Sequence, residues 1–194
     1  MNSVPSMSAN SPAIEITHLG KVFGSFVAVQ DLNVSVQRGE IFGLLGPNES
    51  GKTTTVNMIS GLSQPTTGSI NVLGYDIQKA IRQIRQLVGA VPQETALYEE
   101  LTAWQNMDFH CDLYGVPVRE KASRINALLD LVQLADRKNS RVGTFSGGMK
   151  RRLAFARALL HEPELIYLGR ANAWRGRTKP KRAVGLYART ASAG

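Results

Sequence analysis

The sequence of 194 residues contains one cysteine, Cys111, so no disulfide can form within the chain. We interpret Cys111 as a buried thiol rather than a nucleophile. No apolar run approaches the roughly 20 residues that a membrane-spanning helix needs. Residues 1–12 lack the basic and apolar regions of a secretory signal peptide, and we expect them to be a disordered lead-in. We therefore expect a cytoplasmic protein that reaches a membrane only through a partner.

Acidic residues are absent from the last part of the chain. Residues 169–194 contain seven Lys or Arg and no Asp or Glu, and they carry almost all of the net charge of +8. A basic chain usually suggests nucleic acid or another anionic surface as its partner. Because residues 1–168 are close to neutral, we do not expect nucleic acid to be a partner of this protein.

The remaining pattern is that of an α/β protein, and the length suggests one domain. Apolar and β-branched residues predict strands over 13–19, 26–36, 68–74, 87–93 and 165–168. Residues 39–46 are a short apolar run bounded by glycines, which predicts a buried strand of a parallel sheet. A helix is expected over 51–62. Between 101 and 160 apolar residues recur every three or four positions, which predicts a helical region.

The segment GPNESGKT (46–53) fits the pattern G-x-x-x-x-G-K-[ST] and lies between a predicted strand and a predicted helix. Such a loop offers backbone N–H groups and a helix N-terminus to a polyphosphate. We expect Lys52 to reach the β and γ phosphates and the Thr53 hydroxyl to ligate Mg²⁺. Glu49 should lower the affinity unless its carboxylate points into solvent. The predicted nucleotide-binding residues here are Gly46, Pro47, Asn48, Glu49, Ser50, Gly51, Lys52, Thr53 and Thr54; a glycine-rich turn without a ligand is the alternative.

Three further segments resemble the ATP-binding subunits of ABC transporters. TFSGGMKRRLAFARALLHEPELIYL (144–168) is similar to their signature helix and the strand that follows it, in the form typical of the export-type, multidrug-exporter-like branch. VPQETALYEELTAWQNM (91–107) looks like the Q-loop and the start of the helical subdomain. GKVFGSFVAVQDLNVSVQRGE (20–40) looks like the region that carries the adenine-stacking aromatic residue. With the phosphate loop, four motifs occur in the family's order between residues 13 and 168.

This resemblance implies a fold and a domain plan. The fold would be an α/β P-loop NTPase core of the RecA type, with an N-terminal antiparallel β subdomain and an inserted helical subdomain. The ABC ATP-binding domain would span 13–168, with the helical subdomain at about 95–160. Residues 169–194 would be a basic tail foreign to the family, which leaves the fold incomplete at its C-terminus.

The resemblance also implies roles for individual residues. Phe23 would stack on adenine, although a core aromatic is the alternative. Gln93 would offer its carbonyl to Mg²⁺ or to the attacking water. The signature residues would close on the γ-phosphate held by another subunit, so that two chains enclose two ATP molecules head to tail; a helix N-cap without a ligand is the alternative. These signature residues are Ser146, Gly147, Gly148 and Met149, and the cations after them, Lys150, Arg151 and Arg152, are expected to form a solvated helix face.

The resemblance stops after Leu168. In the family this strand runs into D-E-P-T-x-G-x-D, where the aspartate holds the Mg²⁺ shell and the glutamate polarises the hydrolytic water. Gly169 and Arg170 occupy these two positions. A glycine has no side-chain ligand, and a permanently protonated arginine cannot act as a base. No catalytic residue of this pair is therefore intact, and we expect negligible hydrolysis.

A shift of reading frame would explain the tail. The genetic code allows residues 169–182 to be encoded so that removal of the first base gives D-E-P-T-R-G-V-D in register with the missing motif. The constraint on the codons is strictest at Trp174. Tryptophan has a single codon, and the shifted triplet that overlaps it must encode the glycine of the motif. We expect residues 169–194 to be an out-of-frame translation; a diverged subunit with a basic tail is the alternative.

These inferences predict the ATP-binding subunit of an ABC transporter that couples ATP binding and hydrolysis to export. It would bind ATP and Mg²⁺, pair with itself or a homologous subunit, and lie on the inner face of the cell membrane through a permease partner. Two alternatives remain open. One is a nucleic-acid-associated ABC ATPase, and the other is a non-catalytic regulatory nucleotide-binding subunit.

Overall fold

The computed structural model describes residues 11–47, 50–92 and 95–168 and, for the backbone alone, 183–188. The chain divides into two compact units. Unit 1 contains Met1–Arg85 and Arg170–Gly194, and unit 2 contains Gln86–Gly169. Helix α2 (Ile81–Leu87) crosses from one to the other.

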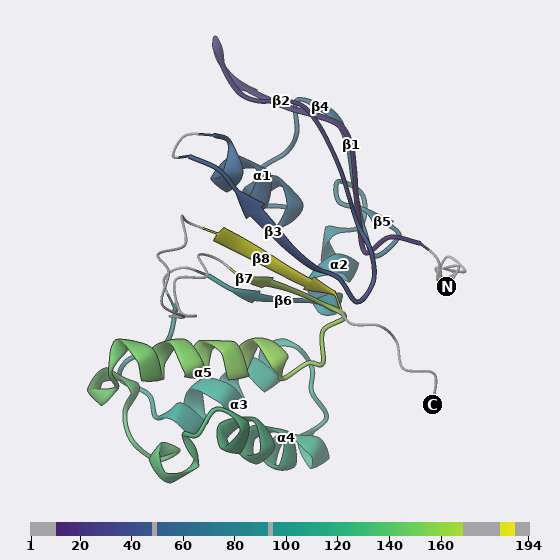
Figure 1. Cartoon of the computed structure of the whole chain (residues 1–194). Coiled ribbons are helices and arrows are strands. Elements are labelled where there is room, and N and C mark those ends of the chain that lie inside the picture. The colour runs from purple at the N-terminus through teal and green to yellow at the C-terminus, as the bar shows by residue number, and fades with distance from the viewer. Residues whose placement is uncertain (1–10, 48–49, 93–94, 169–182, 189–194) are drawn as a thin grey trace. The chain divides into compact units, whose positions relative to one another are not determined.

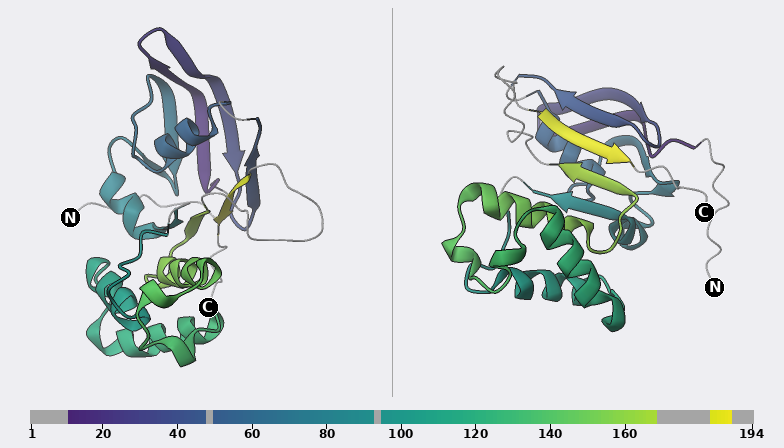
Figure 2. Two further views of the ribbon diagram at one scale, coloured as in Figure 1. Left: turned by 90° about the vertical axis from the view of Figure 1, so that its left-hand side faces the viewer. Right: turned by 60° about the horizontal axis from the view of Figure 1, so that its bottom comes forward.

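The first unit contains an antiparallel sheet with the strand order β2-β1-β4-β5. Its strands are β1 (Ile14–Phe23), β2 (Phe26–Val36), β4 (Thr67–Val72) and β5 (Tyr75–Asp76). The long β1–β2 hairpin is the largest element of this sheet (Figures 1 and 2). It closes at Gly24, whose φ of 59° a glycine adopts without strain. The predicted N-terminal antiparallel β subdomain is therefore present.

Strand β3 (Ile41–Leu45) leads into helix α1 (Lys52–Ile59), as the sequence predicted. The expectation that β3 is a buried parallel strand is wrong. Its backbone pairs antiparallel with β8 (Ala183–Ala188), from Ile41 opposite Tyr187 to Leu45 opposite Ala183. Its side chains alternate between exposed and half-buried, because only one face of the strand is turned towards an apolar core.

That core lies between β3, α1 and the β1–β2 hairpin. Phe42 and Leu44 of β3 line one apolar pocket together with Val56 and Ile59 of α1 and with side chains of both strands of the hairpin. Met58, on the same helix, is completely buried. Burial of these side chains fixes where α1 begins relative to the hairpin, and so positions the loop before it.

Unit 2 combines two parallel strands with three helices. Strand β6 (Val88–Val91) pairs with β7 (Leu165–Leu168), so that Val88 lies opposite Leu165 and Val91 opposite Leu168. The helices are α3 (Ala103–Leu113), α4 (Val118–Leu131) and α5 (Gly147–Leu159). Two short 3-10 turns, Ala135–Arg137 and Val142–Thr144, connect α4 to α5. The predicted helical region at about 95–160 is therefore present.

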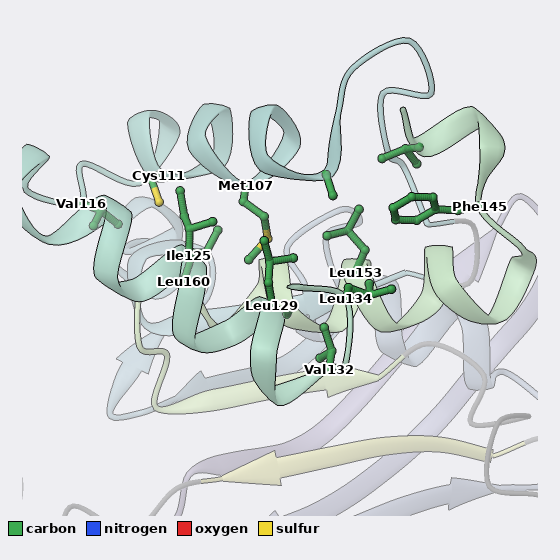
Figure 3. Close-up of a cluster of buried hydrophobic side chains, with 13 residues drawn as sticks. Met107, Cys111, Val116, Ile125, Leu129, Val132, Leu134, Phe145, Leu153 and Leu160 are labelled. Atoms are coloured by element: carbon green, nitrogen blue, oxygen red, sulfur yellow. The ribbon is translucent and has the colours of Figure 1, made fainter. Parts of the chain in front are cut away.

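Apolar side chains from the three helices meet in one buried cluster (Figure 3). Met107 and Cys111 come from α3, Leu129 from α4, and Leu153 from α5. Helix α3 begins with a capping box in which Thr102 and Gln105 satisfy each other's backbone N–H groups. Burial raises the pKa of the Cys111 thiol, in agreement with the expectation of an inert, buried cysteine.

Candidate nucleotide-binding site

The phosphate loop of unit 1 connects the end of β3 at Leu45 to the start of α1 at Lys52. Gly51 is the N-cap of α1, in the left-handed region with φ 77°, and no side chain caps the helix. The first turn of α1 contains no acidic residue. The first N–H groups of a helix have no intrahelical partner, so this end of α1 offers donors and positive potential to an anion.

Lys52 places its ammonium group within the loop itself. Its Nζ donates to the carbonyl oxygen of Pro47 and, at 2.9 Å, to the hydroxyl of Ser50. A Cβ on Gly46 would lie 2.7 Å from Ser50 Oγ and 3.7 Å from this Nζ. A side chain at Gly46 would therefore collide with that of Ser50, and the ammonium group of Lys52 lies next to both residues. A phosphate group suits this set of donors.

Gly51 also fixes the loop against the hairpin. A Cβ at this position would lie 2.5 Å from the carbonyl oxygen of Ala28 and 3.1 Å from Cγ2 of Val29. Strand β2 thus touches the loop only two residues beyond Phe26, where the hairpin turns. The phosphate loop and the hairpin end consequently belong to one site.

Phe23 lies at the last pair of the hairpin, opposite Phe26. Its side chain is 52% exposed, which rules out the alternative of a core aromatic. The ammonium Nζ of Lys21 lies 4.9 Å from the centre of the Phe23 ring. An exposed aromatic face beside a phosphate loop can stack on a nucleobase.

Strands β6 and β7 of unit 2 end together, since Val91 pairs with Leu168 in the parallel register. The residues that follow parallel strands emerge at the same edge of a sheet. Gln93 follows β6, and Gly169 and Arg170 follow β7. The register thus brings Val91 and Leu168, the last residues of the two strands, to one edge of this pair.

The signature segment of unit 2 forms the N-terminus of α5. Ser146 is the N-cap and accepts a hydrogen bond from the backbone N–H of Met149 at 3.3 Å. Ser146, Gly147 and Gly148 are exposed, and a Cβ on Gly147 would meet nothing within 4 Å. The helix end is therefore capped by its own serine and presents an open backbone surface, which an external anion could approach.

Several predicted site residues lie outside the described part of the chain. These are Asn48 and Glu49 of the phosphate loop, Gln93, and Gly169 and Arg170 after β7. The lead-in up to residue 10 also lies outside it, as does the tail apart from the backbone of β8. Of the two predicted Mg²⁺ ligands, only Thr53 is described, and its exposed side chain lies in the first turn of α1.

Comparison with known proteins decides the family. Residues 29–169 match the ABC transporter family. The chain is 43% identical over 155 residues to the linearmycin resistance ATP-binding protein LnrL of Bacillus subtilis, covering 80% of this chain and 50% of the relative. It is 40% identical over 158 residues to the bacitracin transport ATP-binding protein BcrA of Bacillus licheniformis, covering 81% and 51%. The chain belongs to the ABC transporter ATP-binding family.

The ABC fold is also found in solved structures. One ATP-binding subunit of an ABC transporter superposes with a TM-score of 0.71 at 31% identity, covering 79% of this chain and 64% of that chain. The fold class predicted from the sequence is thus confirmed. The chain spans about half the length of the two curated bacterial relatives.

The structure adds contacts that the sequence did not predict. Lys150 was expected on a solvated face, but its ammonium lies 2.5 Å from Glu99 Oε1. Arg152 donates to the carbonyl oxygen of Val132 at 3.0 Å. The guanidinium of Arg157 donates to the carbonyl oxygens of Ala96 at 2.6 Å and Thr95 at 3.1 Å. The contacts of Lys150 and Arg157 thus hold the signature helix of this ABC domain against the segment that follows Gln93. The paired residues are 51 to 62 positions apart in the sequence, which is why sequence patterns did not predict them.

His110 and His161, to which the sequence gave no role, lie in a ring cluster with Tyr114. The His161 and Tyr114 rings are stacked at 4.0 Å, and the imidazole of His161 donates to the carbonyl oxygen of Val88 at 3.1 Å. Burial lowers the pKa of His110 to about 4, helped by Arg157 and His161, and burial also lowers the pKa of His161. We interpret these rings as uncharged side chains that pack α3 against β6.

Within the described residues, no group of three or more His, Cys, Asp or Glu side chains is placed to hold a metal ion. The same part of the chain contains no helix of the length and apolar character that crossing a membrane requires.

Proposed function

We propose that the protein is the ATP-binding subunit of a membrane exporter and transmits the energy of nucleotide binding to a permease partner. The observation that carries the proposal is the loop of an ABC-family chain in which the ammonium group of Lys52 lies beside Ser50 and Pro47, directly before the uncapped N-terminus of α1. The relatives named for linearmycin resistance, bacitracin transport and Nod factor export support export as the direction of transport.

Nucleotide would be held by Phe23 at the base and by the loop from Gly46 to Thr54 at the phosphates. Mg²⁺ would screen the charge of the phosphates when bound. Thr53 suits this ion because its hydroxyl oxygen is exposed at the start of α1, and Gln93 is the second ligand that we propose. The proposed cofactors are thus ATP and Mg²⁺.

A head-to-tail dimer, with itself or with a homologous subunit, is the next part of the proposal. The backbone at the N-terminus of α5 is exposed, and we propose that it completes the nucleotide site of another subunit. Exposed aromatic side chains on the same unit support a permease contact: Tyr98 and Phe109 meet edge to face at 5.4 Å, and Leu113 is 64% exposed. Such a partner would hold the protein on the inner face of the membrane.

Hydrolysis by this chain is proposed to be negligible. Gly169 and Arg170 supply neither a carboxylate for the Mg²⁺ shell nor a base for water. The family match ends at residue 169, which supports the proposal that the codons from there on are read in the wrong frame. Sequencing the gene across Leu168 and Gly169 in independent isolates would contradict this proposal if the frame is uninterrupted.

Binding and hydrolysis can be separated in one experiment. The purified chain, its Lys52→Ala variant and a chain with the reading frame corrected after Leu168 are compared for Mg·ATP binding by calorimetry and for steady-state phosphate release. We expect the chain to bind ATP without turnover, Lys52→Ala to lose binding, and the frame-corrected chain to hydrolyse ATP. ATP turnover by the unaltered chain would refute the hydrolytic deficiency, and absence of ATP binding would refute the nucleotide site.

A non-catalytic regulatory subunit is the second candidate. It is favoured by the contrast between the well-formed, exposed signature helix and the missing acidic pair. Such a chain could complete the ATP site of an intact homologue while hydrolysing nothing itself. Co-purification with a full-length ABC subunit, lost in a Ser146→Arg variant and kept in Lys52→Ala, is the expected result.

A further inference from the structure

The ammonium group of Lys21 is held between an aromatic ring and a carbonyl group. Its Nζ lies 4.9 Å from the centre of the Phe23 ring and donates to the carbonyl oxygen of Gln64 at 2.7 Å. A cation within about 6 Å of a ring centre is attracted by the π system. Lys21 itself is half-buried, whereas Phe23 is 52% exposed. One face of an otherwise exposed ring is therefore covered by a fixed charge.

The sequence builds this contact through an irregular strand. The register of β1 against β2 shifts on both sides of Lys21, between Leu19 and Lys21 and between Lys21 and Val22. Such bulges change the direction of a side chain relative to a regular strand. Residues two positions apart lie on the same face of a regular strand, and Lys21 and Phe23 are in contact beside this irregularity.

The loop before β4 supplies the second support. Thr66 donates its backbone N–H to the carbonyl oxygen of Gly20 at 2.8 Å, and its hydroxyl accepts the N–H of Val22 at 3.1 Å. A Cβ on Gly20 would lie 2.3 Å from Thr67 Oγ1, so the Thr67 side chain would have to move if this glycine were replaced. The loop is fastened on both sides of Lys21, which holds the Gln64 carbonyl next to the ammonium group.

We propose that Lys21 is a positioning residue for the adenine base: it fixes the Phe23 ring from one side and leaves the opposite face for stacking. The inference rests on the proposed function, since it requires that Phe23 stacks on ATP. A ring already fixed in its binding orientation loses less conformational freedom when the base binds. Because Lys21 is paired with Val29, and Val29 contacts Gly51, the ring is fixed relative to the phosphate loop as well.

The size of the effect follows from that of an exposed cation–π contact. Removing the charge should weaken ATP binding about two- to fivefold. Tripolyphosphate has no base, so its affinity should be unchanged if Lys21 acts through the ring. A purely structural or electrostatic role would change both affinities together, and the ratio of the two is therefore the decisive quantity.

The test measures the Kd of Mg·ATP and of Mg·tripolyphosphate by calorimetry for the full chain and three variants. Lys21→Met keeps the length of the side chain without its charge, and Lys21→Arg keeps a cation that also favours aromatic faces. Lys79→Met is the matched control, because it makes the same change at a lysine whose side chain is 84% exposed and lies outside the proposed site. Circular dichroism at increasing temperature checks that each variant is folded.

We expect Lys21→Met to weaken ATP binding alone, Lys21→Arg to restore it, and Lys79→Met to leave both affinities within twofold of the unaltered chain. An unchanged ATP affinity in Lys21→Met, or an equal loss for both ligands, would overturn the role of Lys21. If Lys21→Met is unfolded, the decision passes to Lys21→Arg: an ATP affinity of the folded Lys21→Arg that does not match that of the unaltered chain would overturn the role of Lys21. Absence of ATP binding in the unaltered chain would refute the proposed function itself.

Discussion

Of the single methyl groups that could be added to the phosphate loop, the one added by Gly51→Ala should disturb the loop most. Two costs arise at this position. The residue has φ 77°, where an L-residue with a Cβ is strained by about 1–2 kcal/mol. The new methyl group would also lie 2.5 Å from the carbonyl oxygen of Ala28, so β2 or the loop must move. Overpacking of this kind adds about 1–3 kcal/mol.

Gly115→Ala separates the two costs. Gly115 has φ 69°, close to that of Gly51, but a Cβ there meets nothing within 4 Å. It follows α3 in unit 2, whereas Gly51 lies in unit 1. The control thus reports the strain of the left-handed backbone alone, which we expect to lower the free energy of unfolding in urea by about 1–2 kcal/mol.

Gly51→Ala should lower the free energy of unfolding by about 2–5 kcal/mol and weaken Mg·ATP binding at least about tenfold. The binding loss is expected because a displaced α1 no longer directs its first N–H groups at the phosphates. Gly115→Ala should leave ATP binding unchanged. Equal destabilisation by the two variants, or full ATP affinity in Gly51→Ala, would refute the argument that the loop is seated against Ala28.

Two further predictions concern unit 2. The pKa of His110, lowered to about 4 mainly by burial, lies below its unfolded value of about 6.5. Its contribution to stability is therefore complete above about pH 6.5 and is lost as the pH falls towards about 4. The free energy of unfolding in urea should accordingly depend less on pH in His110→Gln than in the unaltered chain. The same pH dependence in both proteins would contradict this prediction. The buried amide of Asn106 accepts a hydrogen bond from the N–H of Tyr98 and donates one to its carbonyl oxygen, both at 2.9 Å. Asn106→Leu should therefore lower the free energy of unfolding by about 2–4 kcal/mol in the same assay. A loss no larger than that of the exposed control Asn126→Leu would contradict a stabilising role for these two hydrogen bonds.

Local sequence patterns predicted much of the fold because their causes are local. The alternation of β1 and β2 and the glycine between them specify a hairpin. The Thr102 and Gln105 pair specifies the start of α3 within four residues. The phosphate loop is similarly recognisable, since its glycines, Lys52 and Thr53 act within one turn of the chain.

The contacts that the sequence did not predict join distant segments. Lys21 meets Gln64 across 43 residues, and Lys150 meets Glu99 across 51. Neither residue differs by type from an ordinary solvated lysine, and only the path of the intervening chain brings the partners together. Helix α2 was missed because its seven residues, IRQIRQL, run directly into β6 without a boundary signal.

The exposed face of strand β3 is the feature that relates the tail of the chain to the stability of the nucleotide site. Phe42 and Leu44 line an apolar pocket, whereas Ile41 and Leu45 on the other face are 77% and 65% exposed. A strand that carries a phosphate loop in a doubly covered sheet would bury both faces, and each such side chain contributes about 1.5–3 kcal/mol when fully buried. The only backbone pairing described for β3 is to β8, which lies in the segment that we propose is read out of frame. A frame shift after Leu168 would account for the exposed face: the loop keeps the residues that we propose bind phosphate, while Ile41 and Leu45 of the strand that presents it stay exposed.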